Sequence, residues 1–219
     1  MRIKETNHYK KSLFTDLHAF HRSMYMGERQ TYYDRIALAT FQPSNYMSII
    51  LDRMNQNHSK IPYQANLKQF DPSLGQHLQG ILEHGRKLTI YRNFDNVRHD
   101  RNLAIHTMLL QLEARFNEYG KLPPNLFVQV DGGPENCNET FLAVCSLLVH
   151  RRVCGLQSLI LSRLPPGHTH EDIDSKFGVL WRATRNRSIL TPQVNYLLVI
   201  AIITHVTSII IILYRPIKN

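Results

Sequence analysis

The order in which short apolar runs and helical segments follow one another limits the possible folds of this chain more than any other feature. Apolar runs of strand length lie at 46–51, 77–84, 87–93, 126–130 and 156–164. Apolar residues at helical spacing lie at 102–118, at 138–150 and in a segment that ends near 185. The resulting β-β-β-α-β-α-β-α order predicts an α/β fold, in which helices cover a single mixed sheet.

An N-terminal helix is expected before this alternating region. Apolar residues recur at helical spacing within 9–39, and the four that define the stripe are Leu13, Leu17, Phe20 and Met24. The many His and Arg side chains of the same segment form either a solvated face or a nucleic-acid contact. We therefore expect a helical segment at 1–40, followed by a core domain at 41–190.

The C-terminal part of the chain differs from the rest in composition. Residues 195–214 contain no formally charged side chain unless His205 is protonated, and the run has about the length needed to span a bilayer. Tyr196 and Tyr214 would suit the two membrane interfaces. The run predicts an apolar helix over 194–214, which is a candidate transmembrane segment. The alternatives are a buried or misplaced helix rich in β-branched residues, or a terminus that is not the natural end of the domain.

Aspartates stand at the ends of the predicted strands. Asp52 follows the first apolar run and Asp131 follows the fourth, while Asp172 and Asp174 begin the last helix. The carboxyl ends of parallel strands share one edge of a sheet, so these side chains are expected to converge there. Three converging carboxylates repel one another unless a divalent cation lies between them. Oxygen ligands suit Mg²⁺ or Mn²⁺, and such ions can assist phosphodiester displacement.

The last two of these aspartates belong to a dense polar cluster. Residues 167–174 read Gly-His-Thr-His-Glu-Asp-Ile-Asp, and they follow a Pro-Pro pair. The cluster therefore lies where a loop enters a helix, a position suited to a metal or an anion. Ile173 is expected to face the core and the two aspartates to flank that face. The spacing leaves the choice between Asp172 and Asp174 open.

Three segments carry a resemblance to known proteins. They are YMSIILDRMNQNHSKIP at 46–62, LPPNLFVQVDGGPENCNETF at 122–141 and LSRLPPGHTHEDIDSKFG at 161–178. Together they resemble successive blocks of an uncharacterised eukaryotic domain family associated with transposon-derived proteins. The arrangement of acids also resembles the RNase H-like fold of DDE-type transposases and integrases. The resemblance extends from about His18 to Arg185 and ends near Pro192, which leads to the hypothesis that the domain is truncated there.

The resemblance implies a function and a set of site residues. It implies metal-dependent cleavage or strand transfer on DNA with Mg²⁺ or Mn²⁺, in an intracellular, nuclear protein. The implied catalytic and metal-binding residues are Asp52, Asp131 and either Asp172 or Asp174, and the implied secondary residues are His168, Asn136 and Asn138. This chain departs from the family pattern at Gly132, where an amide is usual, and at Cys137, where a basic residue is frequent.

Two other functions compete with this interpretation. His168-x-His170-x-Asp172 resembles the first ligand motif of metallo-β-lactamase-type hydrolases and would bind zinc. However, Ile173 stands where that family has histidine. The second alternative is a non-catalytic remnant that binds nucleic acid or a protein, with the acids as relics.

Charge and cysteine content narrow the possible partners. The formal net charge of +9 fits a polyanionic partner, either nucleic acid or a membrane surface. The three cysteines include no Cys-x-x-Cys pair, which argues against a disulfide framework and a zinc finger. The N-terminus has no apolar run after its charged residues and does not resemble a secretory signal. The sequence does not indicate an oligomeric state.

Overall fold

Strands and helices alternate in the computed structural model of the chain as the sequence predicts. The structure describes residues 2–55, 58–61, 63, 74–94, 100–131, 138–163, 172–191 and 209–213. The strands are β1 (Tyr46–Arg53), β2 (Gln76–Glu83), β3 (Lys87–Phe94), β4 (Asn125–Val130), β5 (Ser158–Arg163) and β6 (Ile209–Leu213). The helices are α1 (Arg2–Phe41), α2 (Arg101–Tyr119), α3 (Glu139–His150) and α4 (Asp172–Thr184), and a 3₁₀ turn, η2, covers Val153–Gly155. A mixed α/β fold is therefore confirmed.

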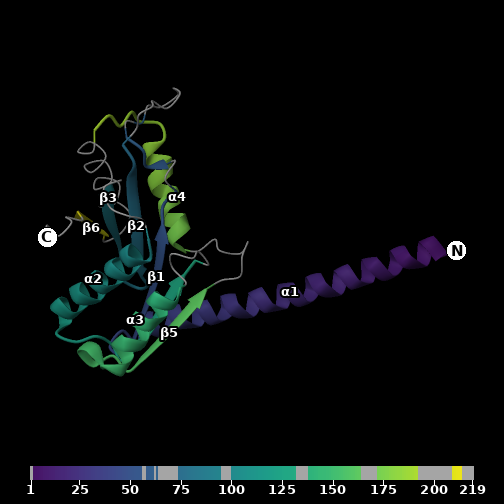
Figure 1. The fold of residues 1–219 in the computed structure, drawn as a ribbon, viewed down its shortest axis with the longest axis horizontal. Helices are drawn as coiled ribbons and strands as arrows, with labels where there is room; N and C mark the ends of the chain where they lie inside the picture. The colour runs from purple at the N-terminus through teal and green to yellow at the C-terminus, as the bar shows by residue number, and fades with distance from the viewer. Residues whose placement is uncertain are drawn as a thin grey trace.

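All described strands belong to one sheet, whose order is β5-β4-β1-β2-β3-β6 (Figure 1). The β2 strand runs antiparallel to both β1 and β3. The β4 strand runs parallel to both β1 and β5. The predicted hairpin therefore joins β2 to β3, and its turn contains Gly85 at a φ of +74°. Glycine adopts this left-handed conformation without the steric cost that other residues incur.

Helices cover both faces of the sheet, because alternate residues of each strand point to opposite sides. On one face, Ile49 and Val128 pack with Met108 of α2 and Phe141 of α3 in a fully buried core. A second core lies on the other face. It joins the strand residues Ile50, Leu78 and Ile90 to α4 residues Ile173, Phe177 and Leu180. The position of α4, which carries Asp172 and Asp174, therefore depends on this second core.

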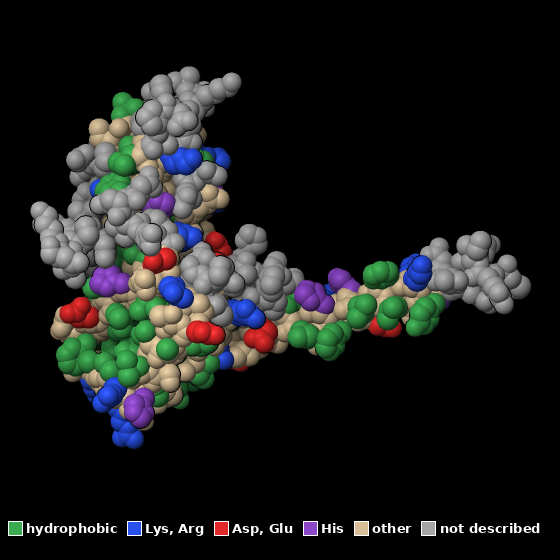
Figure 2. Space-filling view, in the orientation of Figure 1, with side chains coloured by type: hydrophobic (Ala, Val, Ile, Leu, Met, Phe, Trp, Pro, Cys, Tyr) green, Lys and Arg blue, Asp and Glu red, His purple; other side chains and the backbone are tan. Residues whose placement is uncertain are grey.

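The α1 helix projects from the body of the molecule as a long arm (Figure 1). Its C-terminal part packs against the body, where Tyr32 and Ala39 are both 5% exposed. Apolar side chains nearer the N-terminus are exposed, and Figure 2 shows hydrophobic side chains along the arm. The arm therefore carries more apolar surface than its own contacts cover.

The predicted apolar helix at 194–214 is wrong in the part that the structure describes. Residues Ile209–Leu213 form β6, which pairs in parallel with β3 from Leu88↔Ile209 to Arg92↔Leu213. Four consecutive isoleucines favour an extended chain, because β-branched residues have high strand propensity, and the β3 edge supplies the pairing partner. No helix in the described part of the chain is long and apolar enough to cross a membrane. Tyr196 and Tyr214 lie outside the described residues.

Close packing between β2 and α4 makes Gly80 sensitive to substitution. An added Cβ would lie 2.7 Å from Cζ of Phe177 and 3.0 Å from Cδ1 of Ile173, closer than side chains normally approach. We expect Gly80→Ala to lower the free energy of unfolding by about 1–3 kcal/mol, measured by urea denaturation, because the methyl group overpacks this contact. Gly178→Ala is the matched control, since its Cβ would meet only Arg182 at 3.8 Å. Equal destabilisation by both substitutions would contradict the packing argument.

Candidate active site

Asp52 and Asp131 come together because their strands are parallel neighbours. The register of β1 and β4 pairs Leu51 with Val130, and the next residue along each chain is an aspartate. Adjacent strands lie about 4.8 Å apart, so the two backbones are close at this edge of the sheet. The predicted convergence of strand ends is thus present in the fold.

Electrostatic interaction links Asp174 to the same pair. Burial raises the pKa of the Asp52 carboxyl from 3.8 to about 7. A hydrogen bond from the Arg53 backbone opposes this effect, whereas the carboxylates of Asp174 and Asp131 add to it. Three aspartates from β1, the end of β4 and α4 therefore lie near enough for the negative charges of two to disfavour ionisation of the third.

Asp172 has different neighbours, although it lies only two residues from Asp174. Tyr32 of α1 donates its hydroxyl hydrogen to Oδ2 of Asp172 at 3.3 Å. The same carboxylate oxygen lies 3.9 Å from Nε2 of His84, which follows β2. Asp172 thus connects α4 to α1 and to the turn between β2 and β3.

His84 holds this connection through both ring nitrogens. Nε2 lies 3.0 Å from the Tyr32 hydroxyl and Nδ1 lies 2.9 Å from the Ser48 hydroxyl. Burial lowers the pKa of His84 to about 4, partly opposed by Asp172, so the ring is neutral at pH 7. The direction of each of these two hydrogen bonds depends on which ring nitrogen carries the hydrogen. Through these contacts Asp172 attaches the start of α4 to Tyr32 of α1 and to His84 of the β2–β3 turn.

Two residues that the sequence did not indicate also lie at the site. Gln79 and Asp100 line a small cavity of about 70 Å³ together with Asp52, Arg53 and Asp131. Asp100 caps α2, where its Oδ1 accepts hydrogen bonds from the backbone of Asn102 and Leu103. Gln79 is 5% exposed, and its Nε2 has no hydrogen-bond partner in the described part of the chain. An Asp before a helix is a recognisable capping signal, but its proximity to Asp131 depends on the tertiary fold.

Of the remaining predicted site residues, one caps a helix and the others lie outside the residues that the structure describes. Asn138 caps α3 by accepting a hydrogen bond from the backbone of Phe141 at 3.0 Å. A capping role explains its presence without substrate chemistry. His168, Asn136 and His170 lie outside the described residues, and so do Gly132 and Cys137. The zinc motif that begins at His168 consequently stays a prediction.

The donor atoms fit a hard divalent cation, but the described side chains do not form a compact ligand cluster. Carboxylate oxygens are the ligands that Mg²⁺ and Mn²⁺ prefer. Among the residues that the structure describes, no group of three or more His, Cys, Asp or Glu side chains has the arrangement of a metal site. The three aspartates are therefore close enough to repel, and binding of a cation would require them to draw nearer.

Comparison with known proteins identifies the family. Residues 67–206 match the family described as a domain of unknown function (DUF7869), and this match covers more than half of the 219 residues. The chain belongs to the DUF7869 family. The match begins after Asp52, later than the resemblance suggested, and extends past Pro192, where the resemblance was expected to end. Among curated proteins, no sequence matches the chain.

Solved structures of a transposase are similar to this DUF7869 chain. The Mos1 transposase paired-end complex with left transposon end has a TM-score of 0.48 at 8% identity, covering 80% of this chain and 53% of that chain. The Mos1 strand transfer complex has a TM-score of 0.38 at 7% identity, covering 79% and 52% respectively. The DUF7869 chain thus spans about half the length of the solved chains that it matches.

The raised pKa of Asp52 predicts a pH-dependent contribution to the stability of the DUF7869 chain. Between pH 4 and 7 the folded state binds a proton that the unfolded state releases, so this contribution is largest at low pH and is lost as the pH rises to about 7. Its upper limit is about 4 kcal/mol. We expect the free energy of unfolding of the parent, measured by urea denaturation, to fall relative to that of Asp52→Asn as the pH rises from 5 to 8.

Comparing the parent with Asp52→Asn cancels the pH dependence of stability that His84 causes, because both proteins contain His84. The pKa of His84 is lowered to about 4, so its contribution has the opposite sign and is lost as the pH falls below about 6.5. A difference between parent and Asp52→Asn that does not change with pH would contradict the assignment of a raised pKa to Asp52.

Proposed function

We propose that this DUF7869 chain is an RNase H-like domain of a transposon-derived protein that cleaves or joins phosphodiester bonds in DNA. Asp52, Asp131 and Asp174 are the proposed catalytic and metal-binding residues. The observation that carries the proposal is the placement of these aspartates: Asp52 and Asp131 directly follow the paired residues Leu51 and Val130 of β1 and β4, and Asp174, in the first turn of α4, is close enough to add to the raised pKa of Asp52.

The sheet topology supports the RNase H-like interpretation. The order β3-β2-β1-β4-β5, with β2 antiparallel to its neighbours, places the carboxyl ends of β1 and β4 side by side at the centre of the sheet. Such an edge is where α/β proteins build their sites. The α4 helix packs on the same sheet through Ile173 and Phe177 and brings Asp174 to it.

The assignment of the third acid to Asp174 follows from the contacts of its neighbour. Asp172 already accepts a hydrogen bond from Tyr32 and faces His84. Asp174 adds to the raised pKa of Asp52. We therefore assign Asp174 to the site and Asp172 to the attachment of α4.

Mg²⁺ or Mn²⁺ fits the proposed residues because all three supply carboxylate oxygens. Bound divalent ions would neutralise the carboxylates and polarise the phosphodiester during attack by water or a 3′-hydroxyl group. The residues of the chain would hold the ions and orient the scissile phosphate. Gln79 lies in the same cavity, with an amide group able to donate a hydrogen bond to a phosphate oxygen.

DNA is the proposed partner because the chain is basic and two arginines lie at the sheet edge that carries the acidic site. The formal net charge of the chain is +9. Arg53 follows Asp52 directly, and Arg163 ends β5 opposite Val130, so two guanidinium groups belong to the edge that carries Asp131. Arginine side chains at such positions bind the phosphate backbone. A nuclear location follows from this function as part of the same proposal.

The absence of a compact three-ligand cluster among the described residues favours a second candidate function. In that case the domain binds DNA without cleaving it, and the aspartates are relics. A single assay separates the two. Purified protein is incubated with end-labelled single- and double-stranded DNA in the presence of Mg²⁺, Mn²⁺ or EDTA, and both cleavage and retention of the DNA are measured.

The proposed function predicts cleavage that requires Mg²⁺ or Mn²⁺ and stops on addition of EDTA. DNA retention without cleavage in either metal supports the non-catalytic alternative and rejects the proposed reaction. If the protein neither retains nor cleaves DNA, both candidate functions are rejected.

A further inference from the structure

The exposed apolar stripe of α1 is the largest feature that the proposed function leaves unused. Tyr9, Leu13, Leu17, Phe20 and Met24 have exposed fractions of 70%, 45%, 54%, 65% and 55%. At about 100° per residue these five side chains lie within an arc of about 80° on the helix. A continuous exposed apolar surface of this kind marks an interaction site.

We propose that residues 13–24 of α1 pair with the same residues of a second copy in a parallel, two-stranded coiled coil. The spacing carries the first part of this inference. Leu13, Leu17, Phe20 and Met24 are separated by four, three and four residues, which is the a/d spacing of a heptad repeat. Leu17 and Met24 then occupy a positions, and Leu13 and Phe20 occupy d positions.

Polar side chains beside the seam favour a second copy in parallel orientation. In this heptad frame Asp16 occupies a g position and His21 the following e position. In a parallel pair, a g residue of one helix faces the e residue five positions later in the other. The imidazole of His21 in each copy could therefore donate a hydrogen bond to the Asp16 carboxylate of the other copy, on both sides of the seam. In an antiparallel pair g faces g and e faces e, so this hydrogen bond is absent.

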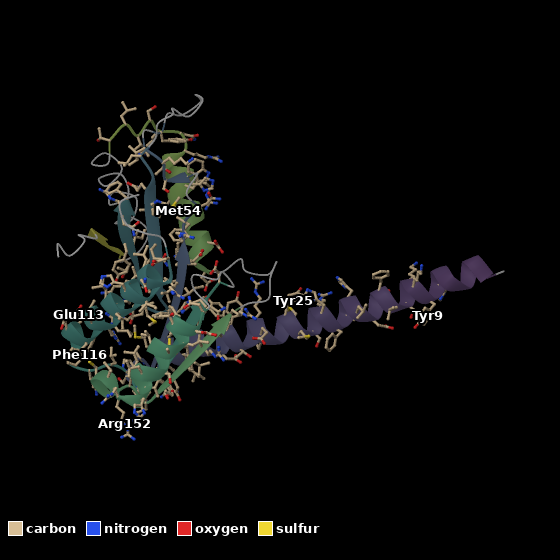
Figure 3. All side chains as sticks on the ribbon, viewed as in Figure 1. Tyr9, Tyr25, Met54, Glu113, Phe116 and Arg152 are labelled. Atoms are coloured by element: carbon tan, nitrogen blue, oxygen red, sulfur yellow. The ribbon has the colours of Figure 1, made fainter. Side chains whose placement is uncertain are left out.

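The arm is accessible for such pairing. Figure 3 shows Tyr9 on the outer part of the arm, away from the body of the molecule. The residues that fix α1 to the body, such as Tyr32 and Ala39, follow the stripe in sequence. The stripe is about 24 Å long at 1.5 Å per residue, so a partner helix can lie along it without displacing these contacts. Such a short seam predicts a dimer that dissociates at micromolar concentrations.

A pair of matched variants tests the pairing by sedimentation equilibrium of the full chain. Leu17→Glu places a charge in the seam, whereas Met26→Glu changes an apolar side chain, 50% exposed, on another face of α1. Because both side chains are exposed in a single copy, neither substitution should prevent folding, which circular dichroism checks. We expect the parent and Met26→Glu to dimerise, and Leu17→Glu to weaken dimerisation by more than about tenfold.

Disulfide trapping tests the orientation. Leu13→Cys alone should form a covalent dimer on mild oxidation, because d residues face each other in a parallel pair. The unmodified chain, treated in the same way, shows how much covalent dimer its own three cysteines form. A monomeric parent, or dimerisation that Leu17→Glu leaves unchanged, overturns the proposal. Trapping only in a mixture of Leu13→Cys and Met24→Cys overturns the parallel orientation.

Discussion

Asp131→Asn should lower the rate of Mg²⁺-dependent DNA cleavage by at least about 100-fold, because even residues that only support a metal ligand cost 10- to 100-fold when removed. Asp174→Asn should have an effect of similar size. Both substitutions keep the shape of the side chain and remove the negative charge that would hold a cation. Cleavage of end-labelled DNA by each purified variant under single-turnover conditions measures the effect.

Asp172→Asn is the matched control on the same helix turn. Its carbonyl oxygen can still accept the hydrogen bond from Tyr32, so α4 should remain in place and the variant should keep most of the activity. Equal rates for the parent and Asp131→Asn would show that the cleavage does not depend on this site. Loss of activity in Asp172→Asn but not in Asp174→Asn would reverse the assignment of the third acid.

Phe177→Ala should lower the free energy of unfolding by about 3–5 kcal/mol, the usual cost of removing a buried aromatic side chain. Phe177 is 6% exposed and packs against Gly80, so it attaches α4 to the sheet. Urea denaturation followed by circular dichroism measures the change. We also expect loss of cleavage, since Asp174 is positioned by the same helix.

Ser175→Ala provides the comparison for this prediction. Ser175 is exposed on α4, so its substitution should change stability little. If Phe177→Ala destabilises the protein no more than Ser175→Ala, the second core does not hold α4 in the way that its contacts indicate.

The order of strands and helices was predictable because it depends on local patterns. The apolar run at 46–51 became β1, Tyr46–Arg53, and the helical spacing at 102–118 became α2, Arg101–Tyr119. Strand and helix periodicities differ enough to be read directly from such segments. The positions of Asp52 and Asp131 at strand ends follow from the same patterns.

The C-terminal segment shows where local patterns fail. A run of apolar, β-branched residues is compatible with a helix or with a buried strand, and its length suggested a helix. The pairing of Ile209–Leu213 with β3 depends on an open sheet edge more than 100 residues earlier in the chain. No pattern within the run itself contains that information.

The choice between Asp172 and Asp174 also depended on distant residues. Tyr32 and His84 are separated from Asp172 by 140 and 88 positions, and their contacts with Asp172 are the reason that we propose Asp174 as the third acid. Gln79 likewise carries no local signal, since an amide in a strand is compatible with many roles. Contacts between distant elements, which the sequence does not display, therefore decide the details of the candidate site.

Manganese binding to purified protein tests the central claim, a shared metal site of Asp52, Asp131 and Asp174, without requiring activity. Isothermal titration of the parent, Asp131→Asn, Asp174→Asn and Asp172→Asn with Mn²⁺ at pH 8 measures it directly. We predict that the parent and Asp172→Asn bind Mn²⁺ alike, and that Asp131→Asn and Asp174→Asn bind at least about tenfold more weakly. No binding by the parent, or equal binding by all four proteins, would contradict a shared site.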